Sequence, residues 1–150
     1  MASPPQIPPQ PQIPGEAMLE IFVHRSIRFP GAPLNTQSPY GDADRLAFIG
    51  SRALETAYAA VLFNQSPQLS AADFHTELAK LGEHVERWVA GYHWKDKVRR
   101  AQDVNLDTVE ESRNIMNAYV GAVFVARGFT TVSSWIVQLV DYSAALQRNG

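Results

Sequence analysis

Apolar residues recur at helical spacing along most of this 150-residue chain, and this periodicity is the feature that most constrains its fold. The clearest case is a predicted helix over about residues 42–64. Its apolar stripe consists of Leu46, Ile49, Leu54, Tyr58, Val61 and Leu62. No stretch of any length alternates with the period of two that a half-buried β-strand requires. The sequence therefore predicts an all-α fold, and 45% hydrophobic residues are enough to supply its core.

Two segments have the pattern of a helix start. Ser70–Asp73 resembles a capping box, and the helix after it is expected to reach about Gly91, with Gly82 as a candidate break. Asp107–Glu110 is a second cap-like start, and the helix after it is expected to end at about Arg127, before Gly128.

A short first helix from Glu16 and a last helix over about residues 132–147 complete the prediction. The apolar face of the first helix consists of Met18, Leu19, Phe22 and Val23. A loop of about a dozen residues is expected before the long helix. The residues that predict this loop are Pro30, Gly31, Pro33, Pro39 and Gly41.

Residues 1–15 differ in composition from residues 16–150, which form the predicted domain. The first fourteen residues hold six of the ten prolines, and no charged residue precedes Glu16. Proline favours polyproline II or disorder, so we expect a flexible, solvated tail or spacer. A ligand for a proline-binding module is the alternative, although no positive charge flanks the prolines.

Composition excludes several classes of protein. Without cysteine, the chain has no disulfide scaffold, cysteine-ligated metal or thiol nucleophile. A formal net charge of −2 is not typical of a strongly basic nucleic-acid binder. No apolar run approaches the ~20 residues that span a bilayer, so no membrane association is expected. Neither a secretory signal nor a transit peptide is visible, and we expect an intracellular protein, cytoplasmic or mitochondrial.

The usual catalytic motifs do not occur in the sequence. The four histidines lack the i, i+4 spacing of a metal-binding helix, and no metal site or cofactor is predicted from them. Neither a nucleophile elbow, a phosphate-binding loop nor a dinucleotide-binding glycine pattern is present.

One basic cluster could contact nucleic acid. It consists of Lys95, Lys97, Arg99 and Arg100, next to Tyr92 and Trp94. Basic residues with interleaved aromatic residues can bind phosphates and stack on bases. Because Asp96 lies within the cluster and several acidic residues follow it, a solvated and partly neutralised surface is the alternative.

Two motifs resemble those of the ribonuclease III family. Asp44-Arg-Leu-Ala-Phe-Ile-Gly-Ser51 is similar to the family signature Glu-Arg-Leu-Glu-Phe-Leu-Gly-Asp. Arg113-Asn-Ile-Met-Asn-Ala-Tyr-Val-Gly-Ala-Val-Phe124 is similar to the second family motif, Ala-Asp-Ala-Leu-Glu-Ala-Leu-Ile-Gly-Ala-Ile-Tyr. The upstream Val23-His-Arg-Ser26 also resembles the family's Thr-His-Arg-Ser. The resemblance covers about residues 16–146 and implies a ribonuclease III-like helical domain that forms a two-fold dimer.

The departures from these motifs concern catalysis. The family holds magnesium with four carboxylates, and the positions that match them are Ala47, Ser51, Asn114 and Asn117. None of these residues is acidic, whereas Mg²⁺ prefers charged oxygen ligands. The resemblance therefore implies a pseudoenzyme with no catalytic residues and no metal.

The dimer-forming residues of the motifs are retained. Gly50 and Gly121 match, and Phe48 matches the residue that in the family inserts into the partner subunit. For Phe48, ordinary packing in the core of its own chain is the alternative. The resemblance implies a homodimer, or a heterodimer with a related chain, that binds double-stranded or structured RNA or an RNA-processing partner. Some family members without the acids serve as structural parts of fungal mitochondrial large ribosomal subunits. The near-neutral charge and the absence of a visible presequence argue against that role here, but not against a regulatory partner of an active ribonuclease III.

An active enzyme with relocated acids is the other hypothesis. Its candidates are Asp42, Asp44, Glu55 and Glu110. Glu55 lies eleven residues after Asp44, or ~16 Å along a helix, which is too far for the two to share one metal. Magnesium-dependent cleavage of double-stranded RNA would distinguish this divergent endonuclease from a binding module.

Overall fold

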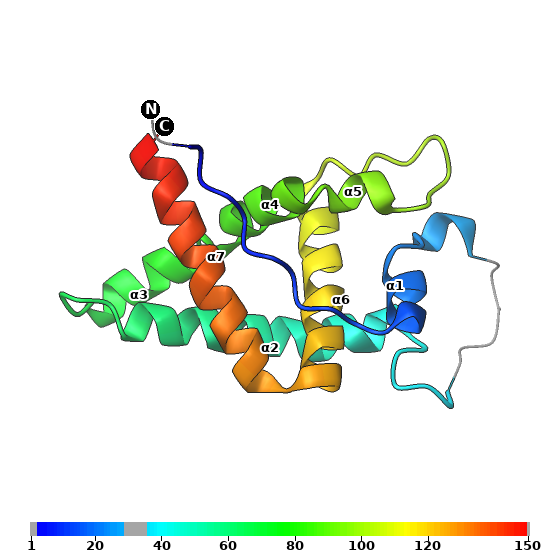
Figure 1. Cartoon of the computed structure of the whole chain (residues 1–150), viewed down its shortest axis with the longest axis horizontal. Coiled ribbons are helices and arrows are strands. Elements are labelled where there is room, and N and C mark those ends of the chain that lie inside the picture. The colour runs from blue at the N-terminus through cyan, green and yellow to red at the C-terminus, as the bar shows by residue number, and fades with distance from the viewer. Residues whose placement is uncertain (1–2, 29–35, 150) are drawn as a thin grey trace.

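The computed structural model describes residues 3–28 and 36–149, and that part of the chain is mostly helical with no β-strand (Figure 1). The prediction of an all-α fold is therefore confirmed. The helices are α1 (Gly15–Ile21), the 3₁₀ turn η1 (Arg25–Ile27), α2 (Ala43–Phe63), α3 (Ala71–Leu78), α4 (Leu81–Tyr92), α5 (Trp94–Lys97), α6 (Val109–Arg127) and α7 (Phe129–Asn149). Pro30, Gly31 and Pro33, which predict part of the loop before α2, lie outside the described residues.

Helices α2 and α6 cross at the centre of the molecule, with α4 and α7 packed around them (Figure 1). Two glycines allow this crossing to be very close. A Cβ atom on Gly50 would lie 1.7 Å from the carbonyl oxygen of Asn117, and one on Gly121 would lie 1.9 Å from that of Leu46. The two helices therefore meet backbone to backbone, which brings the two sequence motifs together.

Side-chain caps start three of the helices. Asp42 accepts a hydrogen bond from the Asp44 amide at the start of α2, and Ser70 accepts one from Asp73 at the start of α3. For α6 the cap is Thr108, which accepts from the Glu111 amide. The cap-like start expected at Asp107 thus lies one residue later, because the hydroxyl of Thr108 reaches the third amide of the helix.

The structure also differs from the prediction in other places, since η1 and α5 were not expected. The expected helix from Ser70 to Gly91 is two helices, and the break falls at Ala79 and Lys80 rather than at Gly82. The last helix begins at Phe129, three residues earlier than expected, directly after Gly128 with its φ of 88°. Glycine at this C-terminal position of α6 allows the chain to turn sharply into α7.

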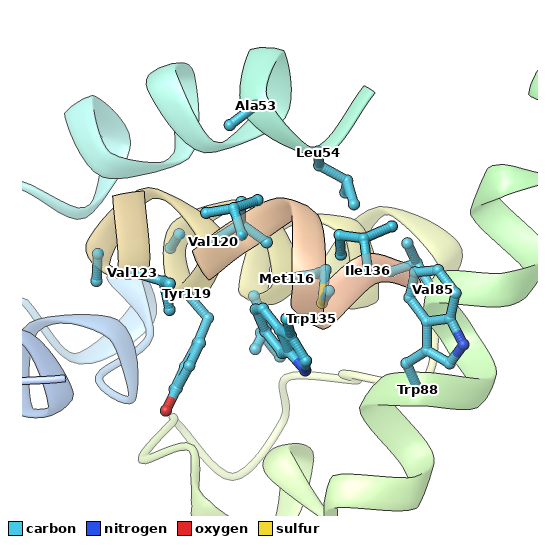
Figure 2. Packing of buried hydrophobic residues seen from close by; sticks show 14 of the residues in the cluster. Ala53, Leu54, Val85, Trp88, Met116, Tyr119, Val120, Val123, Trp135 and Ile136 are labelled. Carbon is cyan, nitrogen blue, oxygen red and sulfur yellow. The ribbon is translucent and has the colours of Figure 1, made fainter. Parts of the chain in front are cut away.

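The core is built from α2, α4, α6 and α7 and is rich in aromatic side chains. Figure 2 shows Leu54, Met116, Val120 and Ile136 packed between these helices. Trp88, Trp94 and Trp135 are each at most 2% exposed. From the N-terminal region the core residues are Ala17, Ile21 and Phe22, whereas Leu19, expected on the buried face of the first helix, is 73% exposed. Of the described helices only α2 is long and apolar enough to cross a membrane by length and composition, and several of its apolar residues, including Leu46, Leu54 and Leu62, belong to this core.

The proline-rich residues 3–14 lie against the helices in an extended path, and we call them the strap. In Figure 1 the strap runs beside α7 and over α4 and α6 to the start of α1. Tyrosine, tryptophan and arginine side chains hydrogen bond to it, and Ile7 and Ile13 pack against the core. The fully solvated spacer expected from composition is wrong in this respect, because apolar residues between the prolines give the segment a surface to bury. The flexibility expected for residues 1–15 stays a prediction.

Candidate functional site

The four positions that the resemblance aligns with acidic residues of ribonuclease III lie around the crossing of α2 and α6. Ala47 and Asn114 both line a cavity of about 270 Å³ next to this crossing. Asn117 is 9% exposed, and its backbone carbonyl faces Gly50 across the helix contact. Ser51 is half-buried and donates a hydrogen bond to the Phe48 carbonyl of its own helix. The structure thus brings Ala47 and Asn114 into one cavity, whose lining does not include Ser51 and Asn117.

The cavity has charged residues of both signs. Its ionisable lining consists of His24, Arg25, Arg28, Asp42, Asp44 and Glu111. The Nε2 atom of His24 lies 3.1 Å from Oε1 of Glu111, and Nη2 of Arg25 lies 3.6 Å from the same oxygen. Because Nδ1 of His24 accepts a hydrogen bond from the Ser26 amide, its Nε2 is the nitrogen that donates to Glu111. The carboxylate of Glu111 is therefore shared between two basic side chains.

Sequence reasoning missed this pairing of His24 with Glu111. His24 belongs to the Val-His-Arg-Ser segment, which the resemblance singled out without giving it a partner. Glu111 stands in the first turn of a helix, where an acidic residue already has a reason to occur. The two residues are 87 positions apart, so no local pattern in the sequence could join them.

A second polar network covers the position of Asn117. The Nε atom of Arg113 donates to Oδ1 of Asn117 at 3.2 Å, and its Nη2 lies 3.2 Å from Oε1 of Glu55. Glu55, one of the candidate relocated acids, is thus paired with an arginine. An arginine beside Asn117 is unfavourable for a cation at this position, since the two positive charges would repel each other.

The other candidate acids do not gather around one point. Asp42 and Asp44 line the cavity, but Asp42 is the cap of α2. Glu110 is exposed in the first turn of α6, and its neighbour Glu111 is the residue that lines the cavity. Among residues 3–28 and 36–149, no group of three His, Asp or Glu side chains could hold a metal ion.

The basic cluster follows α4 and is partly paired with acceptors. Lys95 lies 3.7 Å from Asp107, and Arg100 donates to the backbone carbonyl of Val104. Lys97 and Arg99 are exposed. The backbone of Arg99 bonds to Phe22 and His24, so the cluster is fixed beside the 3₁₀ turn that carries Arg25. This turn adds a 73% exposed arginine side chain that the sequence analysis had not included in the basic surface.

The aromatic residues next to this cluster are buried. Trp94 is 0% exposed and stacks on Tyr119, and Tyr92 is 8% exposed. Their expected role in stacking on bases is therefore wrong for this fold, because neither ring has a free face. Any affinity of the cluster for RNA must come from its charges.

Phe48 lies at the surface of α2. Its side chain is 67% exposed, and the Arg52 guanidinium lies 5.4 Å from its ring centre. Next to it is an open hollow of about 370 Å³, whose lining is mostly apolar. The lining consists of Pro39, Arg45, Leu46, Phe48, Ile49 and Val125. Phe48 is therefore not an ordinary core residue of its own chain.

Comparison of the chain with models of protein families and with curated proteins finds no match.

Proposed function

We propose that this chain is a non-catalytic, ribonuclease III-like module that dimerises and binds structured RNA or an RNA-processing or ribosomal partner. The observation that carries the proposal is the contact of α2 with α6 through Gly50 and Gly121. The two motifs of the resemblance must meet to form one site, although 70 residues separate their glycines in the sequence. Their backbone contact supports the alignment on which the proposal depends.

The side chains at the four acid positions do not fit the family's magnesium ions. Alanine offers no ligand, and serine and asparagine offer only neutral oxygens, whereas Mg²⁺ prefers carboxylates and phosphates. The Oδ1 atom of Asn117 already accepts from Arg113. Without a metal to activate water and stabilise charge on the phosphate, the family's hydrolysis has no counterpart at this crossing. This chemistry supports a binding role rather than an enzymatic one.

The surface around Phe48 supports the dimer. A protruding phenylalanine beside an apolar hollow is self-complementary, because a two-fold axis can place each Phe48 in the hollow of the other copy. Exposed aromatic side chains of this kind contribute a large share of the binding energy at interfaces. We therefore propose a second copy of this chain, or a closely related chain, as the partner of this surface.

Sedimentation of two matched variants tests the dimer. Phe48→Ala should shift the particle mass toward the monomer, because each interface loses two buried phenyl rings. Phe63→Ala is the control, since Phe63 is equally exposed at the other end of the same helix, where it stacks on Phe74. A wild-type chain that is monomeric at concentrations of tens of micromolar would contradict the homodimer.

Incubation with long double-stranded RNA and Mg²⁺ tests the loss of catalysis. We expect no cleavage under conditions in which an active ribonuclease III degrades the substrate completely. The endonuclease hypothesis predicts cleavage that Asp44→Asn abolishes. Asp44 is the acidic residue closest in sequence to Ala47, which the resemblance aligns with the first metal-binding carboxylate of the family. Cleavage with this sensitivity would overturn the assignment as a pseudoenzyme.

A further inference from the structure

The strap meets the helices with a period of three residues. Its outward positions are Gln6, Pro9 and Gln12, which are exposed, and the residues between them are half-buried. Polyproline II has three residues per turn, so these three positions form one edge of such a helix. The inner edges are Pro5-Pro8-Pro11 and Ile7-Gln10-Ile13. Pro14, with φ −59° and ψ 150°, has the backbone angles of this conformation.

Side chains beneath the strap recognise this geometry through its backbone. Tyr92 donates to the carbonyl of Pro8 at 2.5 Å, and Tyr119 donates to the carbonyl of Pro11 at 2.6 Å. The two carbonyls are three residues apart, which is one turn of polyproline II, so they project from the same edge. Figure 2 shows the hydroxyl of Tyr119 directed away from α2.

Contacts among the aromatic side chains orient one of the donors of this surface. Trp135 donates to the hydroxyl oxygen of Tyr92 at 3.0 Å, which directs the hydroxyl hydrogen toward Pro8. Burial raises the pKa of Tyr92 to about 12, so its hydroxyl stays protonated at neutral pH. Trp94 adds a bond from its indole nitrogen to the side-chain oxygen of Gln10 at 3.2 Å. We call the surface formed by Tyr92, Trp94, Tyr119 and Trp135 the aromatic groove.

A glycine makes room for the aliphatic residue of the strap. Ile7 lies over Gly91 of α4, where a Cβ atom would be 2.7 Å from its Cδ1 atom. Arg127 then binds the carbonyl of Gln12 at 2.7 Å near the other end. Next to the aromatic groove, Gly91 thus makes room for Ile7, and Arg127 donates to the strap backbone.

We propose that the aromatic groove is a receptor for polyproline II segments, with the strap as its intramolecular ligand and an uncharged, proline-rich segment of a partner protein as its second ligand. Its contacts are to backbone carbonyls, an amide and an aliphatic side chain, which any segment with this pattern can offer. A partner segment binds by displacing the strap. This receptor function is independent of the proposed ribonuclease III-like role, because it uses other residues.

Two full-length variants with the same added charge test this proposal. Ile7→Asp places the charge in the groove and should release the strap, whereas Gln6→Asp places it on the outer edge and should not. The probe is a synthetic peptide of residues 3–14, and its binding is measured by calorimetry and by tryptophan fluorescence. Ile7→Asp should bind it at least ~10-fold more tightly than wild type or Gln6→Asp, because the strap competes at an effective concentration of order millimolar.

Changes in the groove and in the peptide locate the binding. Adding Tyr119→Phe to Ile7→Asp should weaken peptide binding about fivefold, as expected for one lost hydrogen bond to a carbonyl. A peptide with alanine at Gln6, Pro9 and Gln12 should bind like the original, and one with glycine at Pro5, Pro8 and Pro11 should bind more weakly. The proposal is overturned if a folded Ile7→Asp chain does not bind the peptide at about 1 mM. It is also overturned if adding Tyr119→Phe leaves the affinity for the peptide unchanged.

A label on the outer edge provides a test that leaves the groove intact. Because the chain has no cysteine, Gln6→Cys accepts a single nitroxide. Its spectrum should show restricted motion that becomes free when peptide is added at about 10 mM, in excess of the effective concentration of the strap. A label that is mobile without peptide, or that stays restricted at this excess, overturns the proposal even if Ile7→Asp does not fold.

Discussion

The imidazole ring of His84, in α4, packs against two aromatic rings. Its ring lies 5.9 Å from that of Trp88 and 5.8 Å from that of Tyr58, centre to centre. Its Nδ1 atom is buried without a hydrogen-bond partner among the described residues. Burial, with the nearby Arg87 and Lys80, lowers the pKa of His84 below its usual 6.5, against the opposite effect of Glu83 and Glu77. The folded protein therefore favours the neutral imidazole.

The free energy of unfolding should fall as the pH drops below 6.5, where His84 in the unfolded chain takes up a proton that the folded chain resists. This contribution is complete above the unfolded pKa and is lost as the pH falls through the folded pKa. Urea denaturation of wild type and His84→Phe across this range measures it, and the variant should show a smaller decline. His75→Gln, which changes an exposed histidine, is the control. Equal declines in wild type and His84→Phe would assign the pH dependence to other groups.

At the scale of the helices, the crossing of α2 and α6 depends on the absence of two side chains. Each glycine faces a backbone carbonyl of the opposite helix, and backbone atoms in a helix cannot move aside independently. A side chain at either position would separate the helices and open the core between them. Both glycines belong to the motifs, so fold and resemblance depend on the same residues.

Gly50→Ala should destabilise the protein by about 3 kcal/mol or abolish folding, because its methyl group would overlap the Asn117 carbonyl. Gly82→Ala is the matched control. Gly82 is the second residue of α4, and a methyl group there would lie 3.6 Å from the Val109 side chain of α6, an ordinary contact distance, so Gly82→Ala should change the stability by less than about 1 kcal/mol. Chemical denaturation of both variants gives the comparison. A Gly50→Ala protein as stable as wild type would show that the helices do not meet so closely.

The helices could be predicted from the sequence because their signals are local. The apolar stripe of α2 and the Ser70 cap of α3 each lie within a few residues of the structure that they specify. The break before α4 was harder to predict, since Gly82 is tolerated within a helix when tertiary contacts hold it. The long-range arrangement of the candidate site has no local signal. The hydrogen bond from Tyr92 to the Pro8 carbonyl joins residues 84 positions apart, and it depends on how the fold places α4 beside the strap.

 At the scale of the whole molecule, two segments differ in charge. The strap has no charged residue, whereas the basic cluster contains Lys95, Lys97, Arg99 and Arg100. The strap ends at α1, whereas the cluster is fixed to the segment after α1 by the pairing of Arg99 with Phe22 and His24. Arg25, from the 3₁₀ turn, adds its charge to the surface beside the cluster. The two segments therefore adjoin opposite ends of α1.

RNA binding by this chain should be weak and should fall steeply with salt, because the buried aromatic rings leave only charges to contact phosphates. Arg99→Glu with Arg100→Glu should abolish this binding, because the contacts of both arginines with phosphates are lost. Any binding that remains should show a slope of log affinity against log salt that is smaller by about 0.7–0.9 for each lost contact. The control is Arg87→Glu with Arg148→Glu, which changes two exposed arginines of α4 and α7 and gives the same net charge. Filter binding of a structured RNA over a series of salt concentrations measures both effects. If the two double variants lose affinity equally, net charge rather than the basic cluster governs binding, and if neither does, the RNA binds elsewhere on the molecule.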